Sequence, residues 1–140
     1  MTDALTIGWT RAQADRRRTT YRRLLALNLI LQTVLGLVAI VAPVWLARVA
    51  DLPGPPPAGW IRLWGVMLLI MVLLYVPGWV QPVFVRWPNV VGILARFALA
   101  ITYVFLGQGF RWFALYEVLF ALVLAVTYGR LLRDELMAEP

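Results

Sequence analysis

The chain has 140 residues, of which 62% are hydrophobic and 14% are charged, and its formal net charge is +6. Soluble domains average about 45–50% apolar and about 25% charged residues, so this composition excludes an ordinary soluble domain and predicts an integral membrane protein. His and Cys are both absent, which removes the usual side-chain ligands of haem, zinc, copper and iron–sulfur clusters.

The N-terminal residues 1–23 form an Arg-rich segment that we expect to be a cytoplasmic tail. A basic helix beside a membrane attracts anionic lipid by about 1 kcal/mol for each Arg near the surface. The segment is therefore a candidate contact for anionic lipid or a protein partner, and the alternative is that it serves only as a topology signal. Its arginines are Arg11, Arg16, Arg17, Arg18, Arg22 and Arg23.

Four long apolar stretches follow in chain order, at residues 24–46, 60–80, 90–107 and 112–132. Each is close to the roughly 20 residues that a helix needs to cross a bilayer. The sequence therefore predicts an all-α fold, a bundle of four transmembrane helices that forms one domain over residues 24–133. The Pro-rich residues 51–59 predict a stiff, extended first turn, and Gly107 and Gly109 predict a tight third turn.

The arginines are distributed unequally about these spans. With four spans, the N-terminal tail, the second loop and residues 134–140 share one side, which also holds Arg86, Arg130 and Arg133. The other side has only Arg48, Arg62 and Arg111. The positive-inside rule then predicts that both termini are cytoplasmic. Because every basic residue is Arg, which we interpret as codon bias in a GC-rich bacterial genome, we expect a multi-pass protein of the bacterial inner membrane.

Two ionisable residues fall inside the predicted spans, Arg96 in the third and Glu117 in the fourth. Such a group costs about 2.5–3.5 kcal/mol at the centre of a membrane helix, so it needs a partner, water or a function. Counted from the third turn, their depths differ by about 7 Å, which an Arg side chain can bridge by extending along the helix. We predict an Arg96–Glu117 contact, direct or through water or Tyr103, with Arg62 as an alternative partner for Glu117.

Asn28 and Gln32 in the first span lie at about the depth of Arg96 and are candidates to complete an intramembrane polar cluster. One interpretation is a polar cavity for a lipid headgroup, a quinone or a small polar solute. The other is a structural role, because interhelical hydrogen bonds hold membrane helices together at about 0.6 kcal/mol each. Lipid, quinone or carotenoid could also fill apolar grooves, because none of them needs a His or Cys ligand.

The layout of the last three spans resembles the DoxX-like group of small four-helix bacterial membrane proteins. The resemblance is carried by the sequence Arg62-Leu63-Trp64-Gly65 at the start of the second span, by Arg96 in the third and by Glu117 in the fourth. Some members of that group accompany oxidoreductases as membrane subunits. The resemblance therefore implies an accessory or anchoring role for this chain.

These patterns favour a non-catalytic accessory subunit of a larger inner-membrane complex, with an electron-transfer or oxidoreductase assembly as the expected context. The alternative is a small transporter or a lipid- or quinone-binding protein that uses the Arg96–Glu117 cluster. A membrane enzyme with Glu117 as its base is a third hypothesis, but no second acid, His or nucleophile converges with it. Nucleic acid is not an expected partner, because the arginines flank spans and do not form a folded basic patch.

Overall fold

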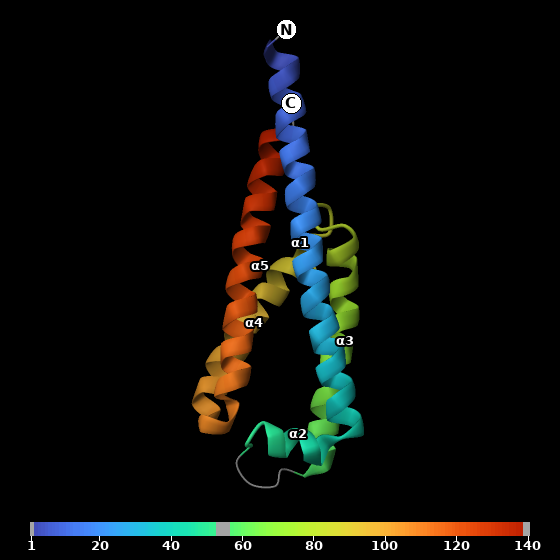
Figure 1. The fold of residues 1–140 in the computed structure, drawn as a ribbon, viewed down its shortest axis with the longest axis vertical. Coiled ribbons are helices and arrows are strands. Elements are labelled where there is room, and N and C mark those ends of the chain that lie inside the picture. Colours follow the sequence, from blue (N-terminus) through green and yellow to red (C-terminus); the bar gives the residue numbers. More distant parts are fainter. Residues whose placement is uncertain (1, 53–56, 139–140) are drawn as a thin grey trace.

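The computed structural model describes residues 2–52 and 57–138, and all of their regular structure is helical (Figure 1). Four of the helices are long and apolar enough to cross a membrane, which confirms the predicted all-helical fold and the number of candidate spans. The elements in chain order are α1 (Thr2–Val41), α2 (Pro43–Val49), α3 (Ala58–Val80), α4 (Trp87–Leu106), the 3₁₀ helix η1 (Gln108–Phe110) and α5 (Arg111–Ala138).

Helix α1 runs without a break through the Arg-rich segment and the first span, for 40 residues. At 1.5 Å per residue this is about 60 Å, twice the thickness of the hydrocarbon core. The prediction that the first span extends to residue 46 is wrong, because α1 ends at Val41 and Pro43 begins the separate helix α2. Proline lacks the amide donor and disfavours helical geometry at the preceding Ala42, whose φ and ψ are −127° and 56°.

The other predicted span limits lie close to the observed helices, except that α5 continues as far as Ala138. The predicted third turn is present: Gly107 adopts a φ of +100°, which a residue without a side chain reaches easily. Residues 53–56 of the predicted Pro-rich turn, residues 139–140 of the predicted C-terminal tail, and Met1 lie outside the described residues.

The long helices pack as two pairs, α1 with α3 and α4 with α5, and α1 also packs closely against α5 (Figure 1). In the first pair the backbones approach closely at two glycines. A Cβ atom added to Gly65 would lie only 2.6 Å from the carbonyl oxygen of Gly36. Small residues at this crossing therefore allow the close backbone approach that is typical of membrane helix pairs.

The two pairs join most closely near the loop between α3 and α4. A buried apolar cluster draws residues from all four long helices there: Tyr21, Leu25, Leu29, Tyr75, Ile93, Leu124, Tyr128 and Leu131. From this region the ribbons of α1 and α5 diverge toward α2 (Figure 1). We call the end with this cluster and residues 81–86 the closed end, and the end with α2 and η1 the open end.

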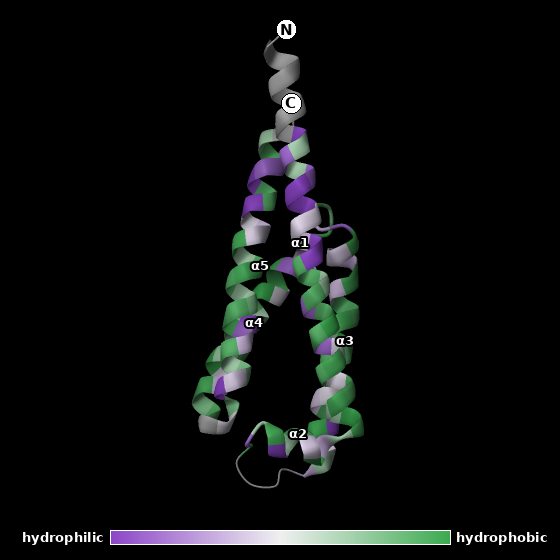
Figure 2. Cartoon of the chain, viewed as in Figure 1, coloured by the Kyte–Doolittle hydropathy of each residue, from purple (hydrophilic) through white to green (hydrophobic). Residues whose placement is uncertain are grey.

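Most residues along each long helix of the bundle are hydrophobic, whereas hydrophilic residues gather where α1 and α5 extend beyond it (Figure 2). Large apolar side chains are exposed on every long helix, for example Ile30, Leu73, Phe105 and Leu119. Soluble monomers rarely expose such continuous apolar surface. The surface therefore has the character that contact with lipid chains requires.

Candidate functional site

Arg96 and Glu117 form a direct ion pair in the interior of the bundle. Nη1 of Arg96 donates a hydrogen bond of 2.6 Å to Oε2 of Glu117. The two residues are only 2% and 4% exposed, so neither charge reaches the surface of the protein. The predicted contact between α4 and α5 is therefore present without Tyr103 as an intermediary, and each charge compensates the desolvation of the other.

Polar side chains from the other two long helices surround this ion pair. The Tyr116 hydroxyl donates a 3.1 Å hydrogen bond to Oδ1 of the buried Asn28 on α1. The Tyr75 ring on α3 lies with its centroid 5.9 Å from the guanidinium carbon of Arg96, within the range of a cation–π interaction. We call the buried polar set that draws on all four long helices the polar layer: Asn28, Tyr75, Arg96, Tyr116 and Glu117, together with the buried Gln32 one turn from Asn28 on α1.

Several buried atoms of the polar layer make no hydrogen bond to any described residue. They are Nε and Nη2 of Arg96, Nδ2 of Asn28 and Oε1 of Gln32. More than nine in ten buried polar groups in proteins have a hydrogen-bond partner. The unpaired atoms, most of them donors, are therefore suited to bind water or a polar ligand group.

An aromatic groove with a volume of about 400 Å³ opens at the open end, between α3 and the α4–α5 pair. Trp64 and Phe113 meet edge to face at 5.5 Å, and Tyr103 stacks on Phe110 at 6.0 Å between ring centroids. The volume and the apolar lining are typical of small-molecule sites. The groove is lined by Leu46, Leu52, Trp60, Ile61, Trp64, Leu99, Tyr103, Leu106, Phe110 and Phe113.

No residue of the polar layer lines this groove, but the two features lie about one helical turn apart along α4 and α5. Leu99 lines the groove and follows Arg96 by three residues, and Phe113 lines it and precedes Glu117 by four residues. Residues at these spacings share one face of a helix. The ion pair therefore lies on the same faces of α4 and α5 as the groove, but deeper in the bundle.

The structure separates two residues that the sequence placed in the polar cluster. The exposed Arg62 donates from Nε to the carbonyl oxygen of Ile40 at 3.3 Å, so its predicted pairing with Glu117 is wrong. Tyr103 is buried but lies in the aromatic groove. Asn28 and Gln32, the predicted polar residues of the first span, are both buried. Asn28 is joined to the polar layer by its hydrogen bond with Tyr116.

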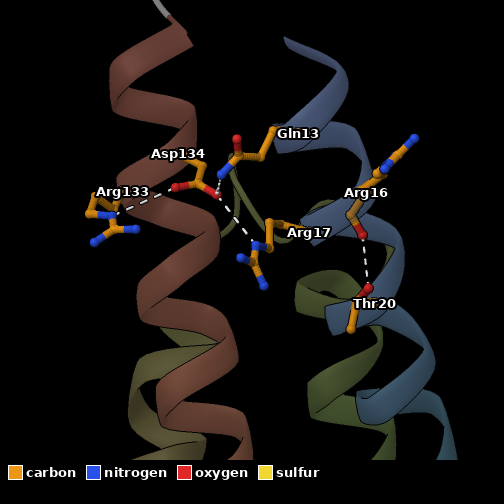
Figure 3. Close-up of polar contacts among 6 residues, drawn as sticks. All are labelled: Gln13, Arg16, Arg17, Thr20, Arg133 and Asp134. Carbon is orange, nitrogen blue, oxygen red and sulfur yellow. Dashed lines mark hydrogen bonds and ion pairs between the residues drawn. The ribbon is translucent and has the colours of Figure 1, made fainter. Parts of the chain in front are cut away.

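The arginines of α1 do not form one uniform basic surface. Where α1 and α5 extend together, Arg17 lies 3.4 Å from Oδ2 of Asp134, and Gln13 donates a 3.2 Å hydrogen bond to the same oxygen (Figure 3). Arg133 lies on the other side of this buried carboxylate, at 3.6 Å (Figure 3). Asp134 thus holds the two helices together, a role that the sequence did not reveal because 121 residues separate it from Gln13.

The remaining arginines of the segment differ in exposure. Arg22 lies over the Trp79 ring at 5.1 Å, and its carbonyl oxygen accepts a 3.0 Å hydrogen bond from Nε1 of that Trp. Arg18 is half-buried and its Nε atom makes no hydrogen bond to the described residues. Of the six arginines, Arg11, Arg16 and Arg23 are exposed, so these three remain the best candidates for contact with anionic lipid or a partner.

Comparisons with protein-family models, curated proteins and solved structures gave no match for this chain. The DoxX-like resemblance therefore stays a prediction.

Proposed function

We propose that this protein is a non-catalytic membrane protein that binds one lipophilic small molecule in the aromatic groove, with the polar end of the molecule directed toward the polar layer. The single observation behind this proposal is the alignment of the two features on the same faces of α4 and α5. An apolar wall with a few convergent polar groups at its base is the usual form of a small-molecule site.

A binding role is better supported than catalysis. Glu117 is held by Arg96 at 2.6 Å, which stabilises the ionised carboxylate and engages its Oε2 atom. General acid–base catalysis needs a group with a tuned affinity for protons and access to the substrate. The absence of His and Cys from the sequence further narrows the choice of proton carriers and nucleophiles.

We also propose that the closed end faces the cytoplasm of a bacterium and that the protein spans the inner membrane with both termini inside. The support is the distribution of arginines, because the α1 segment, Arg86, Arg130 and Arg133 all belong to the closed end. Arg48, Arg62 and Arg111 belong to the open end. The positive-inside rule assigns the more basic side to the cytoplasm, and the groove would then open near the outer leaflet.

The experiment that tests the proposed binding is extraction of lipophilic molecules from the protein purified in mild detergent, followed by mass spectrometry. We expect one enriched compound in a near-equimolar ratio to the protein. Leu99→Trp would fill the groove and should lower that ratio at least fivefold. Ile101→Trp, on the exposed face of the same helix, is the matched control and should leave the ratio unchanged. Equal extracts from all three proteins would contradict the proposal.

A second candidate function, an accessory subunit of a larger membrane complex, is favoured by a separate feature. Residues 11–20 of α1 and 130–137 of α5 form a two-helix extension that is fixed by Asp134 (Figure 3). The extension exposes Leu136 and Met137, and such apolar residues beyond a membrane span are suited to contact with another protein. An electron-transfer assembly remains our expected context for such a partner.

This candidate is tested by purification from the native membrane in mild detergent and identification of the chains that remain bound. An accessory subunit should bring partner chains in fixed stoichiometry, and Leu136→Asp should release them. Leu119→Asn, on the exposed face of α5 within the predicted span, is a control for general effects of a polar substitution. Recovery of this chain alone, as a monomer or homo-oligomer, would contradict the accessory role.

A further inference from the structure

The chemical class of the ligand can be inferred from the charges of the polar layer. Arg96 and Glu117 carry opposite charges, are both buried, and lie 2.6 Å apart. Their charges therefore cancel, and the layer offers no net positive charge to balance a bound anion. A second anion on the same guanidinium would lie close to Glu117, and like charges repel strongly where water is excluded.

The polar layer nevertheless contains hydrogen-bond donors that are available to a ligand with acceptor atoms. Arg96 uses Nη1 for Glu117, whereas its Nε and Nη2 atoms make no hydrogen bond to the described residues. These two nitrogens present neighbouring N–H groups on one edge of the planar guanidinium. Nδ2 of Asn28 adds a further unpaired donor from α1. A ligand that satisfies these groups must present oxygen atoms that accept hydrogen bonds.

The groove limits the apolar part of the same ligand. Its volume of about 400 Å³ suits one drug-sized molecule. Stacked and edge-to-face aromatic rings form its wall, and they favour an unsaturated, branched or ring-containing chain as much as a linear one. Leu99 of the groove lining lies one turn from Arg96 along α4, so a molecule whose leading end extends past Leu99 would meet the guanidinium.

We propose that the site takes a single-chain lipophile whose head is an uncharged carbonyl, with the carbonyl oxygen accepting hydrogen bonds from the free Nε–Nη2 edge of Arg96. This inference rests on the proposed function, because it assigns the head group of the molecule that the groove would hold. It also explains why the ion pair and the aromatic groove lie apart. Glu117 neutralises the charge of Arg96, and the groove selects the apolar chain of the ligand. Recognition of the head then depends on hydrogen bonds and not on net charge.

The test uses a dodecyl-substituted benzophenone, whose ketone is both the head group and the photoreactive centre. The purified full-length protein is irradiated with it in detergent micelles, and the cross-linked residues are identified by mass spectrometry. We expect cross-links on residues adjacent to the polar layer and groove. Cross-linking is then competed with methyl pentadecyl ketone, hexadecyl sulfonate and heptadecane, which share a similar chain and differ in the head.

The inference predicts that the ketone competes at a concentration at least tenfold lower than the sulfonate or the alkane. In Glu117→Gln the charge of Arg96 is no longer balanced. The sulfonate concentration needed for competition, relative to that of the ketone, should therefore fall at least tenfold. Glu135→Gln is the control, because Glu135 is a half-buried acid on α5 outside the polar layer. In this variant the three competitors should keep the order of potency found in the unaltered protein. If Glu117→Gln does not fold, the order of potency of the three competitors in the unaltered protein still tests the inference.

Three results would overturn the inference. Stronger competition by the sulfonate in the unaltered protein would assign the site to anions. Equal competition by all three compounds would show that only the chain is recognised and that water satisfies the polar layer, which leaves the proposed groove binding intact. Absence of both specific cross-linking and competition, together with equal lipid extracts from Leu99→Trp and the unaltered protein, would contradict the proposed function as well.

Discussion

The two ends of the bundle are built from similar apolar helices but are held together in different ways. At the closed end, the buried cluster contains residues of all four long helices. At the open end, the corresponding cluster contains Ala39, Leu46 and Ile61 and joins only α1, α2 and α3. The α4–α5 pair contributes no residue to this second cluster and meets it beside the aromatic groove, where Phe113 contacts Trp64 edge to face.

Specific hydrogen bonds accompany the tighter packing of the closed end. Nδ2 of Asn89 donates to the carbonyl oxygen of Gly78 at 3.1 Å, and the Tyr128 hydroxyl donates to the carbonyl oxygen of Pro82 at 3.0 Å. These bonds satisfy the carbonyl oxygens of Gly78 and Pro82 at the end of α3, where the helix no longer supplies hydrogen-bond donors from its next turn. The comparison shows that polar contacts fix one end of the bundle, whereas the other end contains a groove of about 400 Å³.

The largest effect is expected from removing one charge of the polar layer, which lies between the two ends. Glu117→Leu leaves Arg96 buried without a partner and should lower the free energy of unfolding by about 3–5 kcal/mol. The double variant Arg96→Leu, Glu117→Leu removes both charges and should regain most of that loss. Unfolding in mixed detergent micelles, followed by circular dichroism, measures both changes. A double variant no more stable than the single one would show that the two charges do not stabilise each other.

A smaller but clear effect is expected at the closed end from a change at Gly92. A Cβ atom there would overlap the hydroxyl of the buried Tyr75, so Gly92→Ala should cost about 1–3 kcal/mol. Adding Tyr75→Phe should restore little of the stability, because the ring carbons Cζ and Cε1, which Phe keeps, would still overlap that Cβ atom. Gly129→Ala is the matched control, because a Cβ atom there meets no atom within 4 Å. Equal stability of the two alanine variants would contradict the packing described at this end.

A single hydrogen bond at the closed end should contribute less. Tyr128→Phe removes the bond to the Pro82 carbonyl oxygen and should cost about 0.5–1.5 kcal/mol. The same unfolding measurement applies, with Thr102→Val as the control, since the exposed Thr102 hydroxyl bonds only to Ala98 of its own helix. If the two substitutions have the same effect, the link between α5 and the α3–α4 loop contributes nothing specific.

The smallest effect on stability is expected at the open end. Leu99→Trp places a larger side chain in a groove that has room for it, so the free energy of unfolding should change by only about 0.5 kcal/mol. The same variant should lose the bound lipophile, which separates binding from stability. Destabilisation as large as that of Gly92→Ala would mean that the open end is packed as tightly as the closed end.

The features that depend on composition and helical spacing were predictable from the sequence. The long apolar runs indicate the four candidate spans. The ion pair follows from two facts that need no coordinates. Arg96 and Glu117 are costly to bury alone, and a short turn brings α4 and α5 together so that the two residues differ in depth by only about 7 Å, which an Arg side chain can bridge. The contact of 2.6 Å confirms that reasoning.

The groove and the closed end were not predictable in the same way. The groove draws residues from five different elements and the segment after α2, and no spacing along one helix reveals that set. The break at Pro43 was also missed, because the apolar run continues through it and only the backbone restriction of proline ends the helix. The hydrogen bond from Arg62 to the Ile40 carbonyl oxygen could not be predicted either, because it depends on how α1 and α3 cross.

The central claim is that the bundle is fixed at one end and open to a ligand at the other, and distances between spin labels test it most directly. The chain has no Cys, so labels can be placed without background at exposed sites: Leu63 with Phe105 at the open end, neither of which lines the groove, and Val76 with Val91 at the closed end. We predict a broad distance distribution for the first pair that narrows when methyl pentadecyl ketone is added, and a narrow, unchanged distribution for the second. Equal widths at both ends, with no response to the ketone at either, would contradict the account.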